Sequence, residues 1–262
     1  MKNCKLTLVA LFISMFVAST SMADTSLYDW GFYVNGTYNW AVPADAANPL
    51  GIAALGSAFN TSSFDFFTGL GTISLYFDPN AAGTYNVLSY FDHELGESTN
   101  TAYNEYGSVQ GSPAVYQTYQ METPADVVKY MRLSTPHYNN TNEFDGTNPV
   151  PGYDFGAVND ESMGIGWENF ILTADQHAVI TFTLSETAPA SGFYLTQHDD
   201  KALDPATYDD LFPGTDQKIY FSSNLNIVTE GPVGAPEPAT LTLLAIGLAG
   251  MVIRRITDKH TQ

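Results

Sequence analysis

Apolar and polar residues alternate in short runs along the middle of the chain. The clearest run is 72–77, which places Ile73, Leu75 and Phe77 on one side of an extended segment. A period of two with one apolar face predicts a strand of a half-buried antiparallel sheet. Similar runs separated by turn residues predict further strands at 27–34, 37–42, 84–91, 114–121, 165–172, 178–184, 193–198 and 218–228.

Two turn motifs predict where the chain turns between strands. Asn35-Gly36 lies between the first two runs, and Asn-Gly in this position is a strong hairpin signal. Asp78-Pro79-Asn80 separates run 72–77 from run 84–91. Asp, Pro and Asn favour tight turns, so the chain is expected to turn here into run 84–91.

One segment carries helix signals within this strand-rich pattern. Thr123-Pro124-Ala125-Asp126 supplies an N-cap residue, a proline at the first helical position and an acid at the third. The pattern leaves helix and strand equally open for 124–133. Residues 134–162 are rich in Asn, Gly, Pro and Asp, which predicts a long loop.

Many short strands without heptads or internal repeats predict a single all-β domain. The expected architecture is an antiparallel β-sandwich of the jelly-roll type over residues 24–232. Cys4 is the only cysteine and lies in the N-terminal leader. The mature domain would therefore be held by its apolar core, although export permits disulfides.

The N-terminus has the features of a secretory signal peptide at 1–23. Lys2 and Lys5 precede an apolar stretch at 6–18, and the small residues Ser21 and Ala23 suit cleavage by signal peptidase after Ala23. A retained membrane anchor is the alternative. The apolar stretch is shorter than the roughly 20 residues that span a bilayer, which favours cleavage.

The C-terminal segment 233–262 is expected to be a sorting tag. An apolar run at 239–253 predicts a short transmembrane helix, and Arg254-Arg255 would anchor its cytoplasmic end. Pro236 and Pro238 keep the segment before this helix extended, because proline fixes φ and disfavours helix in the residue before it. A processing protease can bind such an extended segment.

Pro236-Glu237-Pro238, the apolar run and Arg254-Arg255 resemble the C-terminal sorting domain of bacterial PEP-CTERM proteins. The resemblance implies export, recognition of Pro236, Glu237 and Pro238 by exosortase, an integral-membrane cysteine transpeptidase, and a role linked to exopolysaccharide and biofilm. The tail 256–262 is longer and less basic than in most members of that class. An ordinary tail anchor with an incidental Pro-Glu-Pro is the alternative.

The charge of the chain restricts its partners. The sequence has 28 acidic and 9 basic residues, and between the two terminal segments there are 26 acidic and four basic residues, a formal charge of −22. Such a surface repels nucleic-acid phosphates and anionic lipid, so neither is an expected partner of the domain. Solubility alone explains the acidity, and a specific cation-binding role is the alternative.

The usual enzyme signatures are absent from the sequence. No Gly-x-Ser-x-Gly elbow, phosphate-binding glycine loop or His-Glu-x-x-His motif occurs, and the mature domain has no cysteine nucleophile. Asp92-His93-Glu94 and Gln197-His198-Asp199-Asp200 offer metal ligands or paired acids, or are polar strand ends. A secreted hydrolase stays open because spacing cannot show which carboxylates face each other across a sheet.

An acidic stretch between runs 193–198 and 218–228 is the best metal-site candidate. Clustered carboxylates suit Ca²⁺, which takes about six to eight oxygen ligands, although the spacing is not that of an EF-hand. A solvated acidic loop is the alternative. The candidate ligands are Asp199, Asp200, Asp204, Asp209, Asp210 and Asp216.

Several tyrosines in polar segments predict a second kind of site. Flat rings can stack on sugar faces, although most such rings in proteins belong to the core. The tyrosines are Tyr103, Tyr106, Tyr116, Tyr119, Tyr138 and Tyr153.

Taken together, these features predict an exported, non-enzymatic surface or matrix protein. A Ca²⁺-dependent carbohydrate-binding module is the alternative, and a secreted hydrolase is a third possibility.

Overall fold

The computed structural model describes residues 25–41, 57–95, 105–146, 159–199 and 217–230. Within these ranges it contains strands and one short α-helix. The strands are β1 (Thr25–Val34), β2 (Thr37–Ala41), β3 (Phe59–Asp65), β4 (Leu70–Phe77), β5 (Gly83–Leu95), β6 (Glu105–Gln110), β7 (Gln117–Glu122), β8 (Thr141–Asn142), β9 (Ser162–Leu172), β10 (Gln176–Ser185), β11 (Tyr194–Asp199) and β12 (Lys218–Thr229), and the helix is α4 (Pro124–Met131).

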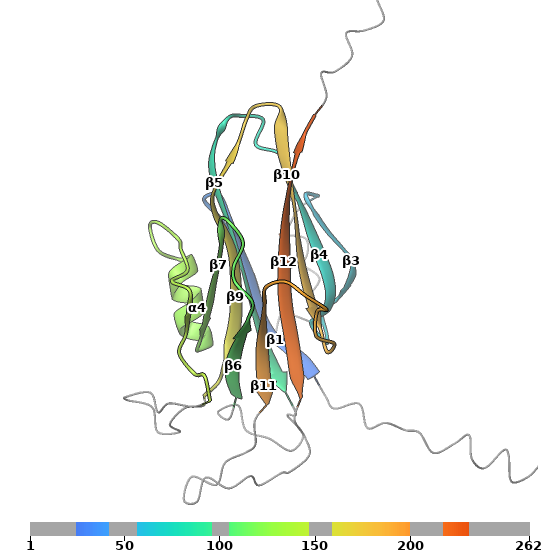
Figure 1. Cartoon of the computed structure of the whole chain (residues 1–262), viewed down its shortest axis with the longest axis vertical. Coiled ribbons are helices and arrows are strands. Elements are labelled where there is room, and N and C mark those ends of the chain that lie inside the picture. Colours follow the sequence, from blue (N-terminus) through green and yellow to red (C-terminus); the bar gives the residue numbers. More distant parts are fainter. Residues whose placement is uncertain (1–24, 42–56, 96–104, 147–158, 200–216, 231–262) are drawn as a thin grey trace, which may run out of the picture.

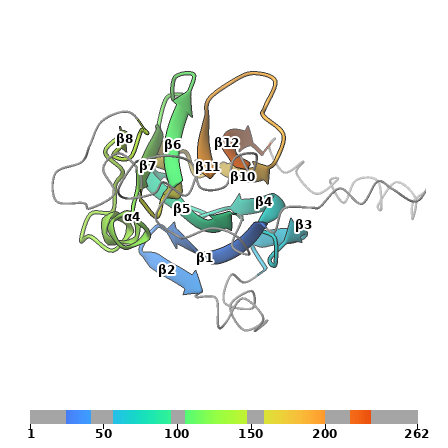
Figure 2. The same cartoon turned by 90° about the horizontal axis from the view of Figure 1, so that it is seen from below.

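Two sheets of six strands pack face to face (Figure 1). The first sheet has the order β2-β1-β5-β9-β7-β8, and the second has the order β3-β4-β10-β12-β11-β6. All neighbouring strands are antiparallel except β7 and β8, which are parallel. The view along the sandwich shows the two layers, with α4 outside the first sheet (Figure 2). The expected all-β sandwich is therefore confirmed.

The predicted hairpin between β1 and β2 is present. Val34 pairs with Thr37, and the two intervening residues, Asn35 and Gly36, have φ of 40° and 98°. Positive φ at both central residues is the geometry of the two-residue turn that Asn-Gly favours. The chain therefore reverses where the sequence indicates.

The main core lies between the sheets. Its centre is Phe32, which is fully buried and whose ring centroid lies 5.0 Å from that of Phe59, 5.3 Å from that of Phe182 and 5.7 Å from that of Phe91. These rings come from both sheets, and their tilted and edge-on arrangements are the favoured ones for aromatic pairs. Aromatic packing across the interface holds the two layers together.

A second, smaller core lies on the outer face of the first sheet. Helix α4 contributes Val127, Val128 and Met131, which pack with Leu88 and Tyr90 of β5. Strands β5 and β9 are consequently buried on both faces along much of their length. The helix resolves the ambiguity at 124–133, because its apolar face meets a sheet surface that would otherwise be exposed.

Tyr138 belongs to this second core and lies directly over β9. An ideal Cβ built on Gly164 would be 2.7 Å from both Cζ and the hydroxyl oxygen of Tyr138, and one built on Gly166 would be 3.2 Å from its Cδ2. The Tyr138 hydroxyl donates to the Ser89 carbonyl at 2.8 Å. The two glycines therefore provide the space in which the ring is buried.

Three strands were not among the predicted runs. β3 and β6 form the two edges of the second sheet, and β8 is a two-residue strand at one edge of the first sheet, inside the predicted 134–162 loop. Edge strands need no continuous apolar face, so their sequences show little alternation. In the described ranges no helix is long and apolar enough to cross a membrane. The predicted signal peptide 1–23 and transmembrane helix 239–253 lie outside those ranges.

Candidate ligand groove and buried carboxyl cluster

A groove lies beside β12, where this strand extends beyond β11. β12 pairs with β10 along its length, from Ser185↔Tyr220 to Gln176↔Thr229. Its pairing with β11 covers only 218–221. The residues that follow Phe221 consequently border an opening of about 450 Å³, which is also lined by the loop before β11.

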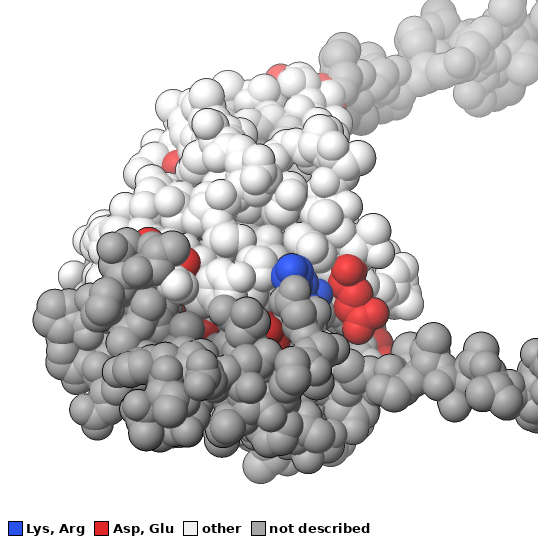
Figure 3. All heavy atoms as spheres, turned by 60° about the horizontal axis from the view of Figure 1, so that its bottom comes forward, with Lys and Arg blue, Asp and Glu red and all other residues white. Residues whose placement is uncertain are grey.

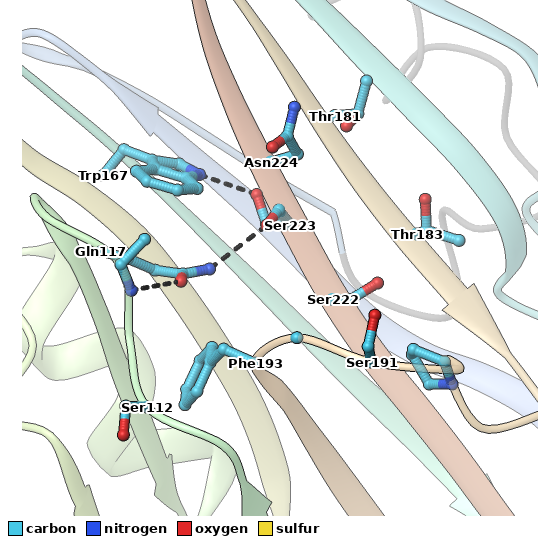
Figure 4. Close-up of a pocket in the computed structure, with 13 residues that line it drawn as sticks. Ser112, Gln117, Trp167, Thr181, Thr183, Ser191, Phe193, Ser222, Ser223 and Asn224 are labelled. Atoms are coloured by element: carbon cyan, nitrogen blue, oxygen red, sulfur yellow. Dashed lines mark hydrogen bonds between the residues drawn. The ribbon is translucent and has the colours of Figure 1, made fainter.

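The groove is lined by polar side chains and two buried aromatic rings (Figure 4). Trp167 donates from Nε1 to Ser223 Oγ at 2.7 Å, and Gln117 donates from Nε2 to the Ser223 carbonyl at 3.3 Å. These bonds join β9 and β7 of the first sheet to β12 of the second. The lining consists of Ser112, Ala114, Gln117, Trp167, Thr181, Thr183, Pro189, Ser191, Gly192, Phe193, Ser222, Ser223 and Asn224.

The more exposed part of the lining comes from the outer face of the second sheet. Thr181 and Thr183 of β10 lie on the far side of β12 from Trp167, with Ser222 between them and the loop residue Ser191 (Figure 4). Asn224 is exposed. Hydroxyl and amide groups that solvent can reach are thus arranged around the groove.

None of the thirteen lining residues has an ionisable side chain. General acid–base catalysis needs a titratable group within hydrogen-bond reach of the reacting atoms, and this lining supplies none. A neutral surface of hydroxyl and amide groups beside aromatic rings suits a neutral ligand that is rich in hydroxyl groups.

The ionisable groups gather elsewhere, at the end of the sandwich where β11 finishes and β12 begins. Asp92, Glu105 and Glu161 are buried there, with exposed fractions of 1%, 2% and 0%. Figure 3 turns this end forward and shows acidic residues where the described part of the chain meets the segments drawn in grey. We call these three residues and Asp160 the carboxyl cluster.

Burial raises the pKa of each member of the carboxyl cluster. The pKa values of Asp92 and Glu105 lie well above their usual range because of burial, and the negative charge of Asp160 adds to the shift of each. Burial, followed by the charge of Glu105, has the same effect on the pKa of Glu161. The pKa of Asp160 is raised to about 6 by burial and by the charge of Asp29. Desolvation and mutual repulsion both favour the protonated forms.

The predicted motif Asp92-His93-Glu94 does not form one site. His93 is fully buried, its Nε2 lies 3.2 Å from the Gly69 carbonyl, and burial lowers its pKa to about 4. Neighbouring residues of a strand point to opposite faces, so His93 and Asp92 face different surroundings. His93 is thus a neutral core residue near neutral pH.

The predicted motif 197–200 is divided in the same way. Gln197 and Asp199 are buried, whereas the His198 ring stacks on Tyr106 at a centroid distance of 4.3 Å. His198 Nε2 also lies 2.8 Å from Ser108 Oγ.

Among the described residues, no three His, Cys, Asp or Glu side chains are grouped so as to hold a metal ion. Of the six predicted Ca²⁺ ligands, only Asp199 falls within the described ranges.

The four described tyrosines of the predicted sugar-stacking platform lie in different surroundings. Tyr138 is buried in the second core, Tyr119 packs on Phe193 at 5.4 Å, and Tyr106 stacks on His198. Tyr116 is 39% exposed, and Tyr103 and Tyr153 lie outside the described ranges. The described rings therefore serve mainly in packing.

The groove has no distinctive sequence pattern. Its lining comes from five separate segments, and four of them contribute small polar residues that are common on any sheet surface. The available signal was the run Ser222-Ser223-Asn224, which interrupts the apolar alternation of β12.

The C-terminal segment matches a known family. No curated protein and no solved structure matches the chain. Residues 235–256 match the family model of the PEP-CTERM protein-sorting motif, a range that contains Pro236, Glu237, Pro238, Arg254 and Arg255 and lies outside the described part of the structure. The motif implies processing by an exosortase-type membrane protein. The chain is therefore a PEP-CTERM domain-containing protein, exported and sorted to the envelope or the extracellular space.

Proposed function

We propose that this protein is a non-catalytic, saccharide-binding component of the cell envelope or extracellular matrix, in a bacterium whose biofilm contains exopolysaccharide. Its ligand is a neutral sugar chain, held in the groove beside β12. The sorting motif directs the domain to the compartment in which such polymers occur.

The observation that carries this proposal is the neutrality of the groove in a strongly acidic domain. The domain has a formal charge of −22, yet the lining contains only Ser, Thr, Asn, Gln, Ala, Pro, Gly, Trp and Phe. Hydroxyl and amide groups can exchange hydrogen bonds with sugar hydroxyls as donors and acceptors. The surrounding negative charge would repel an anionic polymer, so neutral saccharides are the favoured class.

The same lining argues for binding rather than hydrolysis. Most glycosidases place two carboxyl groups about 5–10 Å apart on either side of the scissile bond. No Asp or Glu is among the groove residues, and the carboxyl cluster is buried at one end of the sandwich. Binding without turnover fits the chemistry of the groove.

The test compares two variants of one strand, Asn224→Ala and Asn226→Ala. Both asparagines are exposed on the same face of β12, two residues apart, and only Asn224 lines the groove. Affinity for neutral and uronic-acid-containing oligosaccharides is measured by isothermal titration calorimetry with the mature protein. We expect binding of neutral chains alone, weakened about 3- to 10-fold by Asn224→Ala, which is the effect of one lost hydrogen bond.

Equal affinities for the two variants would remove the groove from the proposal. Absence of binding to every neutral oligosaccharide tested would refute the function itself. New reducing ends after incubation with a bound oligosaccharide would show turnover and contradict the non-catalytic assignment.

A further inference from the structure

Four oxygen-bearing side chains meet between the sheets at the end that holds the carboxyl cluster. Glu105 comes from β6, Asn142 from β8, Gln197 from β11, and Glu161 immediately precedes β9. We call them the oxygen cluster. Glu161 and Gln197 are 0% exposed and Glu105 is 2% exposed, so their polar atoms must find partners inside the protein.

Gly107 brings two of these oxygens together. The three atoms nearest to an ideal Cβ on Gly107 are Met121 Cε at 2.5 Å, Asn142 Oδ1 at 2.8 Å and Glu161 Oε1 at 2.9 Å. Both oxygens therefore approach the same point beside the backbone of β6. Gln197 lies directly opposite Gly107 in the β6–β11 ladder, so its side chain is on the same face of the sheet.

Backbone carbonyls determine which way the two amides face. Asn142 donates from Nδ2 to the Gly107 carbonyl at 2.7 Å, and Gln197 donates from Nε2 to the His93 carbonyl at 2.6 Å and to Glu105 Oε2 at 2.7 Å. A carbonyl only accepts, so each amide nitrogen must face it. Asn142 Oδ1 and Gln197 Oε1 are buried and receive no hydrogen bond.

The Glu161 carboxyl group is also without a donor. Both of its oxygens are buried and have no hydrogen-bond partner. The charged groups that act on it are all acidic: Glu105, Glu122, Asp160 and Glu143. An ionised carboxylate in such a place is costly unless a cation or a proton neutralises it.

We propose that the oxygen cluster binds a divalent cation, Ca²⁺, with Glu161 and Glu105 as carboxylate ligands and Asn142 and Gln197 as amide-oxygen ligands. A set made only of carboxylate and amide oxygens is what hard cations prefer. Ca²⁺ accepts irregular oxygen geometry at 2.3–2.6 Å, whereas Mg²⁺ demands a near-octahedral arrangement. The ion would tie β6 and β11 of the second sheet to β8 and β9 of the first.

This site differs from the acidic stretch 199–216 that the sequence suggested, and it is independent of saccharide binding in the groove. Its function would be to close one end of a sandwich that has no disulfide. Extracellular fluid supplies Ca²⁺ where a PEP-CTERM protein is delivered, and weak sites of about 10⁻⁴–10⁻³ M are sufficient there.

The test measures Ca²⁺ binding to the chelator-treated mature protein at pH 8 by equilibrium dialysis, together with thermal unfolding. The variant is Glu161→Gln and the matched control is Glu168→Gln, since Glu168 is a buried glutamate of β9 that already accepts hydrogen bonds from Thr118 and Tyr138. We expect stoichiometric binding in the wild type and a rise in Tm of roughly 5–10 °C at a hundred times Kd. Glu161→Gln should weaken binding at least about 10-fold, as loss of a charged ligand does, while Glu168→Gln keeps it.

Glu161→Gln removes a buried charge, so in the presence of chelator its Tm should equal or exceed that of the wild type. This measurement shows that the variant folds. If both variants bind Ca²⁺ like the wild type, the ion lies elsewhere and the proposal is wrong. If Ca²⁺ changes nothing and only lower pH raises the Tm, the cluster binds protons alone, and the proposal is equally refuted.

Discussion

Replacing Gly164 by alanine should displace the Tyr138 ring from the outer face of the first sheet. The new Cβ would lie 2.7 Å from Cζ and from the hydroxyl oxygen of Tyr138, and 3.0 Å from its Cε2. Ordinary carbon contacts begin near 3.5 Å, so the ring or β9 must move by several tenths of an ångström. The ring is rigid and 4% exposed, which leaves it little room to turn.

The expected cost is that of overpacking a dense core, about 1–3 kcal/mol of the free energy of unfolding. A shift of the ring also disturbs the hydrogen bond from the Tyr138 hydroxyl to the Ser89 carbonyl, worth about 0.5–1.5 kcal/mol. Gly164 is in a strand and its φ is not in the left-handed region, so the loss is not one of backbone strain. We therefore expect Gly164→Ala to destabilise the domain by about 2–4 kcal/mol in total.

A double-mutant cycle with Tyr138→Ala isolates the clash. Urea unfolding of the wild type, both single variants and the double variant, followed by tryptophan fluorescence, gives the four free energies. Removing the ring makes room for the Cβ, so the double variant should be no less stable than Tyr138→Ala alone, with a coupling free energy of about 1–3 kcal/mol. Additive losses would refute the reasoning, because they would mean that Gly164 is needed for some reason other than Tyr138.

Two further predictions concern the core and pH. Phe32→Ala should lower the free energy of unfolding in urea by about 3–5 kcal/mol, because it leaves a cavity among the rings of both sheets, including Phe182. A loss below about 1 kcal/mol would contradict the central position of this ring. Burial raises the pKa of Glu168 in spite of its hydrogen bonds from Thr118 and Tyr138, so the folded state keeps this proton at pH values where the unfolded chain has lost it. Stability therefore falls as pH rises above about 4.5 through the raised pKa. Glu168→Gln should remove this pH dependence, and urea midpoints that change in parallel for the variant and the wild type from pH 4 to pH 8 would disprove it.

The strands with strong alternation could be predicted from the sequence. In β10 the buried residues Ala178, Ile180, Phe182 and Leu184 recur at every second position, so the pattern alone defines the strand and its inward face. The Asn35-Gly36 hairpin could be predicted because its turn chemistry is local. Local sequence signals were therefore sufficient to predict this strand and this turn.

The rest depended on tertiary contacts. Capping residues favoured a helix at α4 while Val127 and Val128 also suit a strand, and the decision came from the surface of β5 against which both valines pack. β3 and β6 have little alternation because each has only one neighbouring strand in its sheet. No local pattern distinguishes such polar edges from loops.

The candidate sites were less predictable than the fold. The groove depends on where β11 stops alongside β12, which is a matter of strand register rather than of composition. Glu105 and Glu161 lie far apart in the sequence and meet only because β6 and β9 belong to facing sheets. The six aspartates predicted as Ca²⁺ ligands lie close together in the sequence, whereas the buried carboxyl groups do not.

The direction of β12 places the carboxyl cluster and Glu230 at opposite ends of the sandwich. β12 begins at Lys218, beside the carboxyl cluster, and ends at Thr229 at the opposite end of the sandwich, about 40 Å away at the usual rise per residue (Figure 1). Only five residues lie between Glu230 and Pro236, a reach of at most about 20 Å. We therefore expect an exosortase-type enzyme that acts on the motif to meet the end of the sandwich at Thr229, with the carboxyl cluster at the far end.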